Sequence, residues 1–236
     1  MTDSPPNSYS PRWFDSFHAS IPEERTAREV AFICDCAPLP DFQNVLDVCC
    51  GMGRHARALA ARGYVVTGME RDELALTRAR ELGGGPRYVR ADIQHYQPPS
   101  STYDLVIVMS QSFGYFDPAT NRGVLQRLAR AVRDGGRIIL DLWNPAFFAA
   151  HAGEWNFETP TGPVHETKRV VNDRLHVELA YVDGSHDTFE WQLFDRDAME
   201  AEAHSVGLNV IAVWTDFDAT APPSPHKPRL HFILKR

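Results

Sequence analysis

The chain has 236 residues, 43% of them hydrophobic, which favours one compact α/β domain with an elaboration over two independent domains. Its formal net charge of −7 argues against a sequence-independent grip on nucleic-acid phosphates, so no nucleic-acid partner is expected. No apolar run approaches the roughly 20 residues that span a bilayer, and residues 1–11 are polar and proline-bearing, unlike a signal peptide or an anchor. We therefore expect a cytoplasmic protein with no membrane partner.

The N-terminal part of the chain carries aromatic residues at near-helical spacing, namely Tyr9, Trp13, Phe14 and Phe17. Residues 23–36 follow with a second helical pattern. One interpretation is an amphipathic helix that packs on a sheet. The other is a lid in which Tyr9 and Trp13 cover a bound cation, because aromatic faces attract positive charge.

Residues 45–62 form the most informative stretch of the chain. An apolar run that carries Asp47 leads into Gly51 and Gly53, and a helix-like pattern follows. This order predicts a strand, a tight turn and a helix start, a geometry that brings bare backbone against a ligand. Gly51, Gly53 and Ala56 satisfy G-x-G-x-x-G/A, so the glycine spacing alone fits both a dinucleotide site and a site for S-adenosylmethionine (SAM).

Asp47 distinguishes between these two kinds of site. A dinucleotide site requires an apolar residue here, because helices bury the strand on both faces. A buried aspartate is costly unless it is hydrogen-bonded or paired with a cation, and SAM offers a charged amino-acid portion. The alternative is a carboxylate that only braces its own glycine turn.

Residues 47–53, Asp-Val-Cys-Cys-Gly-Met-Gly, resemble the first motif of class I SAM-dependent methyltransferases, roughly D-x-G-x-G-x-G. Cys49 stands where that family usually has its first glycine, so the turn must form without a glycine there. We expect Cys49 to contact the cofactor through its backbone. The four cysteines of the chain lie in two pairs whose spacing matches no zinc site, so reduced thiols and no metal are expected.

The following strands also end on acids. Residues 64–70 end on Glu70, which lies 23 residues after Asp47, close to the offset at which a carboxylate reaches ribose hydroxyls. The alternative is a solvated glutamate at a strand end. Residues 87–93 give a third strand, where the resemblance implies that Asp92 accepts from the adenine amine and Ile93 packs on the ring.

Residues 103–109 form an apolar strand, as expected at the centre of a parallel sheet, and residues 137–143 form a fifth. The intervening loop, Ser-Gln-Ser-Phe-Gly-Tyr-Phe at residues 110–116, resembles that of small-molecule methyltransferases, akin to glycine N-methyltransferases and antibiotic-tailoring enzymes. The Asn/Asp-Pro-Pro-aromatic motif of enzymes that methylate nucleic-acid bases is absent from this loop. A small-molecule substrate is therefore expected.

The C-terminal third predicts antiparallel strands at residues 166–171, 174–182 and 188–194, then a helix at 197–206 and two final strands. We expect an α/β fold, a Rossmann-like doubly wound sheet of about seven strands, mostly parallel with an antiparallel C-terminal hairpin, plus a small antiparallel β insertion. The expected divisions are an N-terminal helical lid (1–40), the SAM-binding core (41–150), the β insertion (151–195) and the C-terminal helix and strands (196–236).

The residues and the resemblance together imply a SAM-dependent methyltransferase that transfers a methyl group to a nitrogen or oxygen of a small molecule by in-line displacement, releasing S-adenosylhomocysteine. An NAD-dependent oxidoreductase and a SAM-binding interaction protein without transfer activity stay open, as do a monomer and a homodimer. No catalytic base is assigned, although Tyr115, Trp143, His151 and His231 are considered. The expected cofactor contacts are Tyr9, Trp13, Asp47, Cys49, Gly51, Gly53, Glu70, Arg71, Asp92, Ile93, Met109 and Ser110, and the expected substrate contacts are Phe113, Tyr115, Trp143 and His231.

Overall fold

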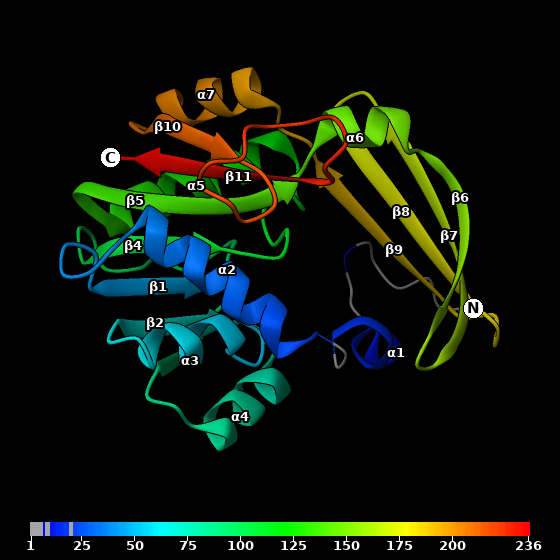
Figure 1. Ribbon diagram of the computed structural model, residues 1–236, viewed down its shortest axis with the longest axis horizontal. Helices are drawn as coiled ribbons and strands as arrows, with labels where there is room; N and C mark the ends of the chain where they lie inside the picture. The colour runs from blue at the N-terminus through cyan, green and yellow to red at the C-terminus, as the bar shows by residue number, and fades with distance from the viewer. Residues whose placement is uncertain (1–6, 8–9, 19–20) are drawn as a thin grey trace.

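The computed structural model describes residue 7, residues 10–18 and residues 21–236 (Figure 1). The helices are α1 (Pro11–Trp13), the π-helix η1 (Phe14–His18), α2 (Glu23–Cys36), α3 (Arg54–Ala60), α4 (Glu73–Leu82), α5 (Pro118–Ala131), α6 (Pro145–Ala150) and α7 (Arg196–Ser205). The strands are β1 (Asn44–Val48), β2 (Val65–Glu70), β3 (Arg87–Arg90), β4 (Tyr103–Val108), β5 (Val132–Trp143), β6 (Gly153–Thr159), β7 (Gly162–Val171), β8 (Arg174–Tyr181), β9 (His186–Gln192), β10 (Asn209–Trp214) and β11 (Arg229–Lys235).

Seven strands form the main sheet, in the order β10-β11-β5-β4-β1-β2-β3. The strands from β1 to β5 pair in parallel, whereas β11 runs antiparallel to both of its neighbours, β5 and β10. The predicted doubly wound sheet with a C-terminal hairpin is thereby confirmed. The strand order reverses between β1 and β4, and open parallel sheets bind ligands outside the carboxyl ends of the strands at such a point.

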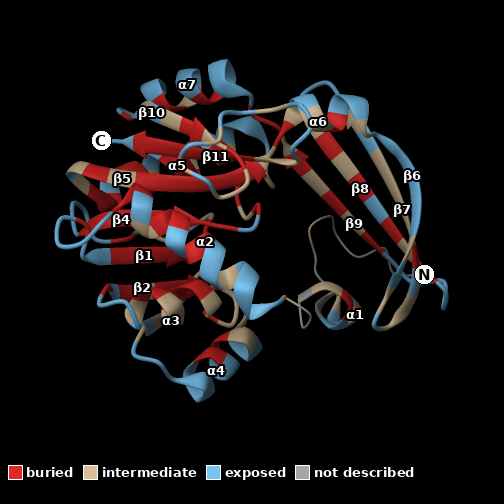
Figure 2. Cartoon of the chain, viewed as in Figure 1, coloured by how far each residue is buried: buried red, intermediate tan, exposed pale blue. Residues whose placement is uncertain are grey.

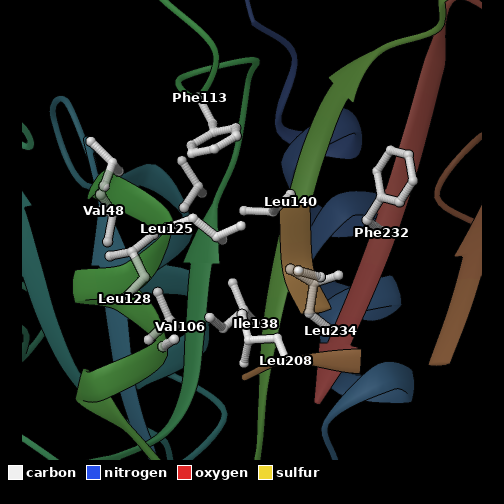
Figure 3. Packing of buried hydrophobic residues seen from close by; sticks show 14 of the residues in the cluster. Val48, Val106, Phe113, Leu125, Leu128, Ile138, Leu140, Leu208, Phe232 and Leu234 are labelled. Carbon is white, nitrogen blue, oxygen red and sulfur yellow. The ribbon is translucent and has the colours of Figure 1, made fainter. Parts of the chain in front are cut away.

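Helices cover both faces of this sheet because its central strands are apolar on both faces. All six positions of β4 are buried. On one face, α5 packs Leu125 and Leu128 against Val106 and Ile138 of the sheet, as Figure 3 shows. Helices α2 and α3 pack on the opposite face, so Figure 2 shows a buried sheet between helices whose outer sides are exposed.

A separate antiparallel sheet has the order β6-β7-β8-β9. It confirms the predicted β insertion, with one strand more than the sequence analysis expected. The additional strand, β6, lies at the edge of the sheet and is mostly exposed. Its only large apolar residues are Trp155 and Phe157, too few for the alternation to predict a strand.

One face of this second sheet, which we call its inner face, is apolar. Leu175, Val177, Leu179 and Tyr181 alternate along β8 and are all buried. Helix α6 packs Phe148 into the same cluster. Asn144 fixes the start of α6, because its side chain accepts from the backbone N–H of residue 146 at 3.1 Å and donates to two carbonyls of the loop before β11.

Three further findings concern the described residues as a whole. Helix α2 has the predicted limits, whereas the aromatic N-terminal segment is a single α-helical turn followed by a π-helical turn. Among the helices of the described residues, none is both long enough and apolar enough to cross a membrane. All four cysteines are free thiols.

Candidate active site

A cavity of about 490 Å³ lies between the carboxyl edge of the seven-stranded sheet and the inner face of the four-stranded sheet. Figure 1 shows the second sheet standing beside that edge, with α1 in the opening between the two. The sheet-edge compartment is defined by Asp47, Cys49, Gly51, Glu70 and Ser110. The aromatic compartment is defined by Tyr115, Trp143, Phe148, Phe189 and Trp191.

The turn between β1 and α3 brings backbone into the sheet-edge compartment. Its backbone is left-handed at Cys49 (φ 57°), Gly51 (φ 53°) and Gly53 (φ 73°). Glycine adopts this conformation readily, whereas another residue loses about 1–2 kcal/mol. Cys49 therefore keeps the left-handed geometry that a glycine would adopt, and the turn holds local strain at the cavity wall.

Asp47 is 1% exposed and still borders the cavity. Its Oδ2 atom has no hydrogen-bond partner among the described residues. Burial raises the pKa of Asp47 to about 7, although the Arg54 guanidinium and the backbone N–H of Ala56 act in the opposite direction. A carboxylate so incompletely compensated is a strong acceptor for a cation or an N–H group that enters the cavity.

Glu70 is the last residue of β2 and lies next to the glycine turn that follows β1. Its Oε2 accepts from the backbone N–H of Gly51 at 3.0 Å, and its Oε1 accepts from the N–H groups of Arg71 at 2.7 Å and Asp72 at 3.0 Å. These bonds tie the end of β2 to the β1–α3 turn. Because a carboxylate offers about four lone-pair sites, Glu70 retains acceptor capacity toward the cavity that it lines.

The loop after β4 is held in place by Asp141, which is completely buried on β5. The Oδ2 atom of Asp141 accepts from the backbone N–H of Ser110 at 2.9 Å and from Arg229 Nη1 at 2.8 Å. Ser110 and Gln111 both adopt left-handed backbone, with φ of 55° and 58°. Burial acts to raise the pKa of Asp141, but Arg229 and His231 outweigh it and lower the pKa.

A second buried acid, Glu29 of α2, lies behind the sheet-edge compartment. It pairs with Arg54, with Arg25 at 3.0 Å and with His55 Nε2 at 2.7 Å. Burial acts to raise the pKa of Glu29, but His55 and Arg54 hold it well below its usual range. Burial lowers the pKa of His55, although the hydrogen bond with Glu29 acts in the opposite direction. Arg54 also reaches the cavity loop, where its Nη2 donates to Ser110 Oγ at 3.2 Å.

The aromatic compartment is built on Trp191 of β9. Ring centroids lie 5.5 Å from Trp191 for Tyr115, 5.7 Å for Phe189 and 5.9 Å for Trp143. Trp191 Nε1 also donates to the backbone carbonyl of Gln111 at 3.0 Å, which connects the second sheet to the loop after β4. This hydrogen bond thus links the aromatic compartment to the loop after β4, which also borders the sheet-edge compartment.

The N-terminal segment bridges the two sheets. Asn7 donates to the carbonyl of Tyr115 at 3.2 Å and accepts from Arg71 Nη2 at 3.3 Å through its own carbonyl. Trp13 lines the cavity with its ring centroid 6.2 Å from that of Phe189. Tyr9, predicted as a lid residue, lies outside the described residues.

Most of the predicted site residues line this one cavity. Those that do so are Trp13, Asp47, Cys49, Gly51, Glu70, Arg71, Ile93, Met109, Ser110, Tyr115 and Trp143. They come from six separate segments of the chain, five of which meet at the carboxyl edge of the seven-stranded sheet, while Trp13 comes from α1.

Two predicted substrate contacts, Phe113 and His231, are buried and lie outside the lining of this cavity. Phe113 is 4% exposed and packs on Phe194, with ring centroids 5.7 Å apart, because Gly114 (φ 99°) turns the loop so that the ring enters the core of Figure 3. His231 of β11 is completely buried and lies opposite Asp141 of β5. Its Nε2 accepts from the backbone N–H of Phe217 at 3.1 Å. From β11, Arg229 lines the cavity instead.

Three other residues considered from the sequence lie away from the cavity lining. Gly53 caps α3, where a Cβ atom would lie 2.3 Å from the Tyr88 hydroxyl, and its contact with the cofactor stays a prediction. The Asp92 carboxylate accepts from the N–H of residue 94 at 2.8 Å, and its contact with adenine stays a prediction. His151 stacks on Phe147 with ring centroids 3.9 Å apart.

Sequence reasoning missed several charged and aromatic residues of the cavity wall, namely Arg25, Arg54, Glu166, Lys168, Trp191 and Arg229. Arg54 begins α3 directly after the glycine turn, so its position next to the motif was an available signal. The others depend on how distant strands and α2 pack together, which no local pattern reveals.

Comparison with known proteins gives a partial match in sequence. The family described as a methyltransferase domain matches residues 45–136. The ubiquinone biosynthesis O-methyltransferase of Vibrio cholerae is 32% identical over 107 residues, which are 43% of this chain and 42% of that protein. The chain thus spans less than half the length of this curated relative.

The match in structure covers nearly the whole chain. A SAM-dependent methyltransferase from Clostridium acetobutylicum superposes with a TM-score of 0.76 at 16% identity, over 95% of this chain and 96% of that one. A SAM-bound amino pentose methyltransferase from Micromonospora echinaspora, involved in calicheamicin biosynthesis, gives 0.72 at 19% identity, over 99% and 100%. The predicted resemblance is confirmed: residues 45–136 match the methyltransferase-domain family, and the chain has the same fold as these SAM-dependent methyltransferases.

Proposed function

We propose that the protein is a SAM-dependent methyltransferase that transfers a methyl group to a nitrogen or oxygen of a small molecule. The observation that carries this proposal is the buried Oδ2 of Asp47, which has no hydrogen-bond partner within the described part of the chain and borders a cavity that continues into a separate aromatic compartment. A cofactor site alone would not require the second compartment.

The residues of the sheet-edge compartment fit SAM. Asp47 would accept from its ammonium group, and the left-handed turn at Gly51 would let the cofactor approach the backbone. Glu70 has acceptor capacity for the ribose hydroxyls, and Ile93 offers an apolar surface to adenine. When bound, SAM supplies a methyl group on a sulfonium sulfur, which a nucleophile displaces in line.

The chain's own contribution is to orient the acceptor and to exclude water. Orientation of two reactants is worth about 7–11 kcal/mol in effective concentration. Tyr115, Trp143 and Trp191 form walls on which a planar or apolar acceptor packs, and Trp13 closes the cavity from the N-terminal side. An amine attacks as the neutral base without further help, whereas a phenol benefits from a general base.

The remaining predictions belong to the same proposal. The N-terminal segment acts as a lid, the four-stranded sheet supplies the acceptor wall, and the protein works in the cytoplasm.

The proposal is tested by calorimetric titration with SAM, S-adenosylhomocysteine and NAD, followed by turnover with a panel of amines and phenols. We expect micromolar binding of the first two ligands, none of NAD, and S-adenosylhomocysteine release with part of the panel. Binding of NAD alone would assign the chain to the oxidoreductases. Binding of SAM without turnover of any amine or phenol would favour a SAM-binding protein without transfer activity.

A further inference from the structure

The inner face of the four-stranded sheet carries one pair of opposite charges at the cavity. Its cavity-lining residues are Glu166, Lys168, Leu175, Val177, Leu179, Phe189 and Trp191, of which only the first two are charged. In the antiparallel register, Glu166 lies opposite Leu179 and Lys168 opposite Val177, so both charges share the apolar face.

A contribution to folding stability does not explain why this ion pair lies on an apolar face. Lys168 Nζ lies 2.5 Å from Glu166 Oε2, and the two side chains are only 23% and 16% exposed. Removing two charges from water offsets much of their attraction, so aliphatic residues at such positions are often equally or more stabilising. The remaining bonding capacity of both groups faces the cavity that they line.

Two other cations of the cavity lining, Arg25 and Arg229, already pair with buried carboxylates. Arg25 pairs with Glu29 at 3.0 Å, and Arg229 pairs with Asp141 at 2.8 Å. Glu166 and Lys168 are therefore the two charges that an acceptor in the aromatic compartment can recruit without breaking the buried networks around the cofactor edge.

Charge balance identifies the acceptor that suits such a pair. A cation that binds Glu166 would displace Lys168 and leave an ammonium group without a counter-charge against an apolar wall. An anion on Lys168 would leave Glu166 in the same state. A ligand with one positive and one negative group contacts both residues and leaves neither charge unpaired.

We propose that Glu166 and Lys168 select the methyl acceptor, and that this acceptor is a small zwitterion with an aromatic ring, its ammonium group on Glu166 and its acidic group on Lys168. The methyl group then goes to a further nitrogen or oxygen of the acceptor, because the ammonium group held by Glu166 has no lone pair with which to attack. The inference rests on the proposed methyltransferase function. The ring packs among Trp143, Phe148 and Trp191, whose neighbouring ring centroids lie 5.2 and 5.9 Å apart. Because one cavity of about 490 Å³ holds cofactor and acceptor together, the acceptor has little more than one ring.

The test measures binding to protein saturated with S-adenosylhomocysteine, with calorimetry or tryptophan fluorescence as the readout. The probes are phenylalanine, phenethylamine, which lacks the carboxylate, and 3-phenylpropionate, which lacks the amine. We expect phenylalanine to bind at least about tenfold more tightly than either analogue, the effect of leaving one buried charge unpaired. Glu166→Gln and Lys168→Gln should each reduce this preference to roughly threefold or less.

A matched control lies on the same two strands. Arg169 and Glu178, 3.9 Å apart, lie on the opposite face of β7 and β8, so Arg169→Gln and Glu178→Gln should keep the preference of the wild-type protein. Affinity for S-adenosylhomocysteine and the melting temperature verify that every variant is folded. Equal binding of the three probes, no binding of any probe, or an unchanged preference in Lys168→Gln would each overturn the inference. Absence of S-adenosylhomocysteine binding would instead overturn the proposed function.

Discussion

The two compartments of the cavity are built in opposite ways. The sheet-edge compartment is assembled from strand–turn–helix units that are each local in sequence, such as β1 with the turn at residues 49–53. The aromatic compartment joins the N-terminal segment, the loop after β4, the end of β5, α6 and three strands of the second sheet. A local sequence pattern therefore predicts the first compartment, whereas the second depends on tertiary packing.

The compartments also differ in how they treat charge. The edge holds the buried acids Asp47, Glu29 and Asp141, and arginines compensate the last two. The aromatic compartment has one half-buried ion pair on an apolar wall. The first compartment thus suits a ligand with charged groups at set positions. The second suits a mostly apolar ligand whose few charges complement one ion pair.

The largest expected effect is that of a substitution at Asp47, which should lower the affinity for SAM without lowering the stability of the protein. Asp47→Asn removes the negative charge in a similar shape, so the ammonium group of SAM loses its partner. Truncating one member of a buried charge pair costs about 2–5 kcal/mol, which corresponds to a loss of at least roughly 30-fold in affinity. Calorimetric titration with SAM measures this loss, and the melting temperature of the ligand-free protein should not fall.

Asp104 provides the control for that experiment. It is the second residue of β4, at the opposite edge of the same sheet, where it accepts from the Asn44 backbone N–H at 2.7 Å and pairs with Arg133. Asp104→Asn should lower the melting temperature and leave SAM affinity unchanged. If both variants lose affinity equally, the effect reflects the sheet and not a contact with the cofactor.

The next prediction tests the bond that fastens the two compartments together. Trp191→Phe removes the N–H that reaches the carbonyl of Gln111 and leaves a buried acceptor unsatisfied, a loss of about 1–3 kcal/mol in the free energy of unfolding. Chemical denaturation measures it. Trp155→Phe on the edge strand β6, where the side chain is 47% exposed, is the matched control and should change stability little. Equal losses in both variants would contradict a specific role for the Trp191 bond.

The sequence was sufficient for the cofactor half of the fold because its signals are periodic and local. The acid at residue 47, the two glycines and the acid at residue 70 recur at fixed offsets along one βαβ unit, and the chain geometry then places them at one edge. Tyr115 was predicted from the mixture of polar and aromatic residues in the loop after β4, and Trp143 lies at the end of the predicted fifth strand.

The acceptor half was not accessible in the same way. Glu166 and Lys168 lie in a strand whose alternation gives no sign of which face is inward until the register with β8 is known. His231 was predicted as a contact because histidine carries chemistry, but its strand lies inside the sheet and buries the ring on Phe217. Residue type predicts a site only where the position of the side chain is already known.

A smaller effect is the pH dependence of SAM binding. Because burial raises the pKa of Asp47 to about 7, SAM affinity should rise roughly 25-fold between about pH 5.5 and pH 7.5 as the carboxylate ionises. Over the same range the ligand-free protein should lose stability, since the folded state holds a proton that the unfolded chain releases near pH 4. Both trends should vanish in Asp47→Asn, and a pH-independent affinity in the wild-type protein would contradict the assignment.

The smallest expected effect concerns the strain stored at Cys49. At a φ of 57°, alanine bears the same left-handed penalty as cysteine, whereas glycine does not. Cys49→Gly should therefore be more stable than Cys49→Ala by about 1 kcal/mol in chemical denaturation, and both should bind SAM, because the thiol itself is not required. Ala119→Gly in the first turn of α5, where the backbone is helical, is the opposite control: there glycine should be the less stable residue. If the alanine variant at residue 49 matches the glycine variant in stability, the left-handed backbone of the turn does not reduce the free energy of unfolding.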